Sequence, residues 1–144
     1  MTAVRPMRPG DADAVADLTT QLGYPTDAEG VTASMARVLA RPGEALLVTV
    51  DEADRPVGWI HVGLSPVLGA PPSATIHGMV IDAAHRSKGI GADLLSSAEA
   101  WARANGATSM IVRSRTSREG AHRFYERHGY AETKRSVVFG RELG

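Results

Sequence analysis

The segment from Ile76 to Trp101 constrains the fold more than any other part of this chain. Its apolar start, Ile76–Ile81, has the composition of a β-strand and ends at Asp82. The turn Arg86–Gly91 follows, and apolar side chains then recur at the spacing of one helix face until Asn105-Gly106 gives a stop signal. These side chains are Ile90, Leu94, Leu95, Ala98, Trp101 and Ala102. The segment predicts a strand, a turn and a helix in direct succession.

The turn Arg86–Gly91 is basic and contains two glycines. Because it opens into a helix, it combines unpaired backbone N–H groups and the positive end of the helix dipole with the cationic side chains of Arg86 and Lys88. This combination suits a diphosphate group. The pattern matches neither the dinucleotide fingerprint G-x-G-x-x-G nor the P-loop, and an ordinary turn with a solvated basic surface explains these residues equally well.

The composition limits the classes of partner. The 144 residues include 16 Lys and Arg against 16 Asp and Glu, and a net charge of zero argues against a nucleic-acid partner. The absence of cysteine excludes a disulfide, a thiolate nucleophile and a zinc–cysteine site. Neither a signal-peptide segment nor a run of membrane-spanning length is present. We therefore expect a cytoplasmic protein with no nucleic-acid and no membrane partner, and one domain over residues 1–144.

The rest of the chain supplies further elements. Its periodicity predicts strands over Val4–Pro9, Glu44–Val50, Pro56–Leu64 and Ala107–Arg113. Pro6 favours an edge position for the first strand, and the second and third should form an antiparallel hairpin. Helices are expected after the capping residues Asp11, Thr26 and Ser117. The C-terminal part Tyr130–Leu143 should be extended, as one bent strand or a tight hairpin. This element order predicts a mixed α/β (α+β) fold around one sheet.

Two motifs, separated by one helix and one strand, carry a family resemblance. Met79–Gly91 reads M-V-I-D-x-x-x-R-x-x-G-x-G, and Ala121–Tyr130 reads A-H-R-F-Y-E-R-H-G-Y. The chain resembles the GCN5-related N-acetyltransferase (GNAT) family, which transfers acetyl from acetyl-coenzyme A to an amine, and Arg118–Leu143 looks most like aminoalkylphosphonate-type small-amine members. The resemblance implies a central, mostly antiparallel twisted sheet with splayed central strands, helices on both faces, and a homodimer.

The resemblance also implies how acetyl-coenzyme A would bind, with no metal required. It places the pyrophosphate on the turn formed by Arg86, Ser87, Lys88, Gly89, Ile90 and Gly91. It places the pantetheine arm along the backbone of Met79, Val80 and Ile81. Arg118 stands where the family often has asparagine and could reach a phosphate, while Ala121 is small where the arm passes.

The chemistry needs an acid and a base. Tyr125 matches the family's general-acid position, and a phenol with a pKa of about 10 can donate a proton to a thiolate. His77 stands where many members have glutamate and is the candidate base, with His61 as the competing base. Trp59 and His61 alternate on one strand face and Tyr24 lies in a loop, so all three are candidates to contact substrate. Each of these residues also has a purely structural interpretation, as a packed aromatic or a satisfied strand histidine.

These features predict direct transfer of acetyl to the primary amine of a small molecule in a ternary complex. No acidic cluster surrounds Tyr24 or the loop Ser65–Pro72, which disfavours a polycationic aminoglycoside. Two alternatives remain open. One is a protein acetyltransferase acting on N-termini or lysines, and the other is a non-catalytic sensor of acetyl-coenzyme A.

Overall fold

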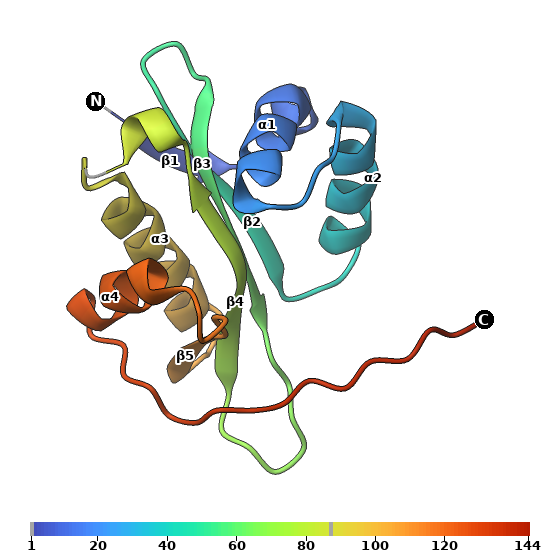
Figure 1. The fold of residues 1–144 in the computed structure, drawn as a ribbon, viewed down its shortest axis with the longest axis vertical. Coiled ribbons are helices and arrows are strands. Elements are labelled where there is room, and N and C mark those ends of the chain that lie inside the picture. Colours follow the sequence, from blue (N-terminus) through green and yellow to red (C-terminus); the bar gives the residue numbers. More distant parts are fainter. Residues whose placement is uncertain (1, 87) are drawn as a thin grey trace. The chain divides into compact units, whose positions relative to one another are not determined.

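The computed structural model describes residues 2–86 and 88–144 (Figure 1). The chain forms two compact units, Met1–Arg113 and Ser114–Gly144. Ser87, one of the residues predicted to bind the cofactor, lies outside the described residues. None of the described helices is long and apolar enough to cross a membrane.

The first unit is built on a five-stranded sheet in the order β1-β2-β3-β4-β5. The strands are β1 (Ala3–Pro6), β2 (Glu44–Val50), β3 (Pro56–Leu64), β4 (Ser73–Ile81) and β5 (Ser109–Val112). Neighbours pair antiparallel except β4 and β5, which are parallel. The predicted hairpin and the edge position of the first strand are confirmed. That strand ends earlier than predicted because a 3₁₀ turn begins at Pro9, and β5 is also shorter than its predicted range.

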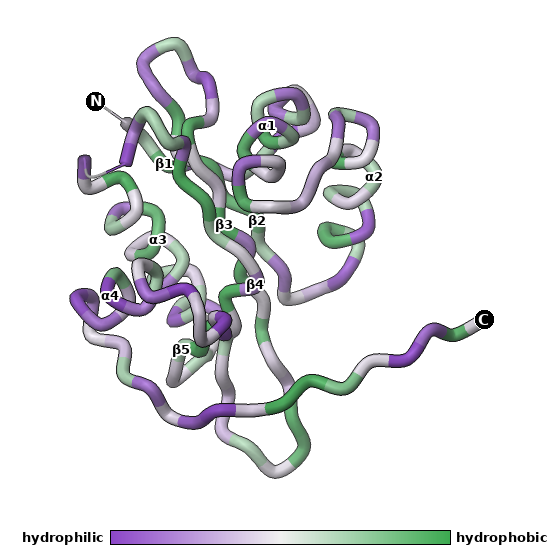
Figure 2. The backbone as a smooth tube through the Cα atoms, in the orientation of Figure 1, coloured by the Kyte–Doolittle hydropathy of each residue, from purple (hydrophilic) through white to green (hydrophobic). Residues whose placement is uncertain are grey.

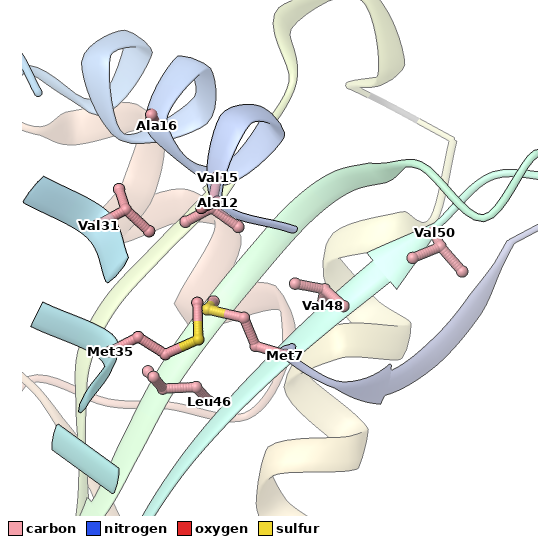
Figure 3. Packing of buried hydrophobic residues seen from close by; sticks show 9 residues of the cluster. All are labelled: Met7, Ala12, Val15, Ala16, Val31, Met35, Leu46, Val48 and Val50. Carbon is pink, nitrogen blue, oxygen red and sulfur yellow. The ribbon is translucent and has the colours of Figure 1, made fainter. Parts of the chain in front are cut away.

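Helices cover both faces of this sheet (Figure 1). Helices α1 (Ala12–Leu22) and α2 (Ala28–Leu39) lie on one face, and α3 (Ile90–Ala104) lies on the other. Figure 3 shows the core under α1 and α2, where Met7 and Met35 meet above Leu46. The residues of α3 predicted to face inward are buried, apart from the partly exposed Trp101. The predicted mixed fold with helices on both faces of a mostly antiparallel sheet is thus confirmed.

Two helix caps predicted in the first unit are wrong. Asp11 does not cap α1: its carboxylate accepts two hydrogen bonds of 2.8 Å from the Arg5 guanidinium and one of 2.7 Å from the Arg8 N–H. A buried carboxylate is stabilised more by a bidentate guanidinium than by a helix end. The second helix is capped by Asp27, whose side chain accepts from the Gly30 N–H, one residue later than the predicted Thr26.

The second unit contains α4 (Glu119–Arg127), with the residues up to Gly144 after it. Helix α4 follows Arg118 without a side-chain cap, so the predicted cap Ser117 is also wrong. The predicted C-terminal strand or hairpin is not formed. The stretch over 137–139 is apolar (Figure 2), and each of its residues is at least 77% exposed. A strand needs a neighbour to satisfy its backbone groups, and the described residues of this unit supply none.

Candidate active site

Strand β4 is paired on both sides only along its first half. Its residues Ser73–Ile76 pair with β5, while residues 77–81 continue beside β3 alone within the described part of this unit. The backbone of Met79, Val80 and Ile81 therefore has no strand partner on the β5 side. A splayed edge of this kind leaves N–H and C=O groups available to an extended ligand, which agrees with the opening that the family resemblance implies.

A β-bulge marks the point where β4 and β5 separate. In the β3–β4 register, His61 lies opposite Gly78 and Val62 lies opposite Ile76, which leaves His77 as the extra residue. A bulge changes the direction in which a side chain points. Here it brings the His77 ring to 4.6 Å from the His61 ring, measured between centroids. Both candidate bases therefore lie together.

Glu44 completes this cluster, and sequence reasoning missed it. Its carboxylate oxygen Oε1 lies 2.8 Å from Nε2 of His61, and only 10% of the Glu44 side chain is exposed. The candidate ligand atoms of Glu44, His61 and His77 all lie within 4.8 Å of one another. Gly63, directly opposite Glu44, gives the carboxylate its room, because a Cβ at position 63 would lie 2.2 Å from Oε2.

The electrostatics of the cluster favour proton acceptance. Partial burial of the ring lowers the pKa of His77, and the neighbouring His61 lowers it further, while Glu44 opposes the shift. His77 is therefore neutral at pH 7. When Glu44 accepts a hydrogen bond from Nε2 of His61, the other ring nitrogen of His61 is left as a proton acceptor. The arrangement of carboxylate and imidazole can also stabilise the imidazolium that forms.

A pocket of about 310 Å³ lies beside this cluster, under α1 and α2. Tyr24, Trp59 and His61, the three residues predicted to contact substrate, all line it. Gly78 makes room for Trp59, since a Cβ there would lie 3.0 Å from the indole ring. The indole nitrogen of Trp59 is buried without a hydrogen-bond partner among the described residues. The fold thus brings Tyr24 to the same pocket as Trp59 and His61, which lie far from it in the sequence.

The predicted phosphate turn leads into α3 as expected. Gly89 has φ +77°, a left-handed conformation that favours glycine, and no side chain caps the helix after it. A Cβ at position 89 would meet nothing within 4 Å, so backbone conformation, and not crowding, accounts for this glycine. Arg86 and Lys88 are exposed, whereas the side chain of Ile90 is buried, which leaves only the backbone of Ile90 for a ligand.

The second unit carries the candidate acid. The ring of Tyr125 packs against Phe124 and Tyr130, at centroid distances of 5.3 and 5.7 Å. Burial raises the pKa of Tyr125, and the nearby Arg118 partly offsets this, so the phenol is protonated at neutral pH. Ala121 lies one helical turn before Tyr125 on α4.

The other three histidines are held by local hydrogen bonds. Nδ1 of His85 lies 2.8 Å from the Asp82 carboxylate. His122 and His128 each place a ring nitrogen 2.8 Å from a backbone carbonyl of their own unit. These contacts give each of the three histidines a local structural role.

Comparisons with known proteins identify the fold and the family. The model of the acetyltransferase (GNAT) family matches residues 13–130. An aminoglycoside N-acetyltransferase solved with a CoA bisubstrate analogue is 16% identical, with a TM-score of 0.85 and 99% of both chains covered. An aminoglycoside 6'-N-acetyltransferase from Acinetobacter baumannii is 18% identical over 100% of both chains, with a TM-score of 0.84. A Trypanosoma brucei acetyltransferase is 22% identical, with a TM-score of 0.81, covering 98% of this chain and 100% of that one. A search of curated proteins finds no match.

Proposed function

The chain belongs to the acetyltransferase (GNAT) family, and we propose that it transfers acetyl from acetyl-coenzyme A directly to the primary amine of a small molecule. The observation that carries the proposal is the cluster of Glu44, His61 and His77, which borders a pocket of about 310 Å³. This volume is at the lower end of the range for small-molecule sites, about 300–1,000 Å³. Solved structures of the same fold that contain CoA or a CoA analogue support acetyl-coenzyme A as the cosubstrate.

Removal of a proton from the amine is the first requirement. A primary amine with a pKa of about 10.4 is almost entirely ammonium at pH 7 and cannot attack a thioester. We assign this proton to the pair His61 and Glu44, because His61 lines the pocket and Glu44 fixes its ring. His77, beside them and neutral, is the second candidate base. Either histidine can act directly or through a water molecule.

Acetyl transfer then exchanges one bond for another. The amine nitrogen forms a bond to the acetyl carbonyl carbon as the carbon–sulfur bond breaks, and the departing thiolate takes a proton. Tyr125 is the proposed donor, and the pKa of its phenol, raised by burial, keeps the proton available. A backbone N–H near Val80 on the splayed edge of β4 is the proposed donor to the carbonyl oxygen.

Residues of both units are proposed to bind the cofactor. The pantetheine arm would pair with the free edge of Met79, Val80 and Ile81, and the pyrophosphate would occupy the uncapped start of α3. Arg86, Lys88 and the glycines of the turn are the proposed phosphate contacts. Arg118 and Ala121 are proposed contacts from the second unit.

Steady-state kinetics test the proposal. Thiol release is measured while acetyl-coenzyme A and an amine are varied together, and intersecting double-reciprocal lines are expected for direct transfer in a ternary complex. Parallel lines would indicate a covalent intermediate and contradict it. Tight acetyl-coenzyme A binding without turnover of any amine would favour the sensor, and turnover of peptides alone would favour a protein acetyltransferase. The narrower relation to aminoalkylphosphonate enzymes stays a prediction, and 2-aminoethylphosphonate belongs in the panel.

A further inference from the structure

The pocket that holds His61 has an unusual lining for a site that binds charged amines. Its floor and walls include Met7, Val31, Met35 and Leu46, all at most 9% exposed. Trp59 adds an aromatic surface, and the remaining polar groups are mainly hydroxyls. Among the described lining residues there is no aspartate, glutamate, lysine or arginine.

This lining decides between classes of amine. A second ammonium group inside the pocket would lose its hydration without gaining a carboxylate, which is strongly unfavourable. A phosphonate or carboxylate would likewise find no cationic side chain on the lining. An apolar body attached to the amine gains the full benefit of leaving water, and the two methionines can adapt to its shape.

We infer that the acceptor is an apolar monoamine, a single primary amine on an arylalkyl or branched-alkyl body. This inference rests on the proposed function and specifies its substrate class. In the productive complex the body lies against Met7, Met35 and Trp59, and the amine nitrogen faces His61. The Glu44 carboxylate is hydrogen-bonded to His61 and supplies a negative charge near the amine. The site thus accepts one cationic group and one only.

A panel of four amines tests this class: 2-phenylethylamine, spermidine, neamine and 2-aminoethylphosphonate. Burial of one aromatic or branched side chain is worth roughly 1.5–3 kcal/mol, so kcat/KM for 2-phenylethylamine should exceed that of each polar amine by about 10- to 100-fold. An equal or higher kcat/KM for spermidine, neamine or the phosphonate overturns the inference while leaving the acetyltransferase function intact. If none of a broad set of amines is acetylated, the proposed function fails and the inference fails with it.

A charge variant at the pocket gives a second, independent test. Thr26 lines the pocket, is exposed, and lies just before α2, where a negative charge is compatible with the helix dipole. Thr26→Asp should raise kcat/KM for spermidine about fivefold relative to the isosteric control Thr26→Asn, as expected for one exposed ion pair. The value for 2-phenylethylamine should not rise in Thr26→Asp relative to Thr26→Asn. Equal values for spermidine in the two variants would contradict the assigned pocket.

Discussion

The contact between Gly63 and Glu44 allows the proposed base to be disturbed without deleting any of its groups. In Gly63→Ala, the new Cβ would lie 2.2 Å from Oε2 and 2.8 Å from Oε1 of Glu44. Ordinary contacts of a Cβ begin near 3.4 Å, so the carboxylate must move by more than about 1 Å. It lies at the end of a flexible side chain and can swing away, which breaks its 2.8 Å hydrogen bond to His61.

The fold should tolerate this substitution better than the activity does. Gly63 is not in the left-handed region, and alanine within a strand is favoured over glycine by about 0.5–1 kcal/mol. The lost hydrogen bond involves a charged group and is worth about 1.5–3 kcal/mol. We therefore expect kcat/KM to fall by about 10- to 100-fold. The gain from alanine offsets part of the lost hydrogen bond, so the free energy of unfolding should fall by only about 0.5–2.5 kcal/mol.

A double-mutant cycle identifies the cause of the loss. Thiol release is measured for wild type, Gly63→Ala, Glu44→Ala and the double variant, together with urea unfolding of each. If Gly63 acts by leaving room for the carboxylate, Gly63→Ala should have almost no effect once Glu44 is alanine. Wild-type activity of Gly63→Ala, or an equal loss in the Glu44→Ala background, would refute the argument.

Four further predictions concern separate parts of the chain. Tyr125→Phe should lower kcat by about 100-fold or more with little change in acetyl-coenzyme A affinity by calorimetry, and a large loss of affinity would instead make Tyr125 a binding residue. The imidazole of His77, followed by NMR, should titrate below about 6.5 because of burial and His61, and a higher midpoint would contradict the cluster geometry. Asp11→Asn breaks a buried ion pair and should cost roughly 3 kcal/mol in urea unfolding. Burial alone would raise the pKa of Asp11, but the hydrogen bonds from the Arg5 guanidinium and the Arg8 N–H outweigh it and hold this pKa low. The stability advantage of wild type over Asp11→Asn should therefore be complete above about pH 4 and be lost only as pH falls through the pKa of Asp11 in the folded protein. Loss of that advantage at a higher pH would contradict this. The predicted homodimer should use the exposed stretch 137–139, so removal of residues 136–144 should halve the mass by light scattering, and an unchanged mass would exclude that segment.

Local signals were enough to predict most of the first unit. The bounds of β2 and β3 and the start of α3 follow from composition, turn residues and period, each of which acts within a few residues. The C-terminal segment was predicted wrongly because its extended, apolar character says only that it could pair. Whether it pairs depends on the free edge of another strand, and the residues around Phe139 carry no information about such an edge.

The candidate site was predictable in part, and the missing part has a specific cause. The motif predicted the position of the turn that leads into α3. Alternation on β3 predicted that Trp59 and His61 share a face, which the pocket confirms. The meeting of His61 and His77 depends on a one-residue bulge, and a bulge shifts the register in a way that strand periodicity does not reveal.

Glu44 could have been found only by asking why glycine occurs inside two neighbouring strands. Glycine weakens a strand, so its presence there often means that another group passes closely over the backbone. The structure supplies that group in both cases, the Glu44 carboxylate over Gly63 and the Trp59 ring over Gly78. The Glu44 carboxylate lies beside His61, and the Trp59 indole lines the pocket, so both glycines make room for side chains of the proposed site. Gly63 and Gly78 are therefore as much a part of the proposed acceptor site as the side chains for which they make room.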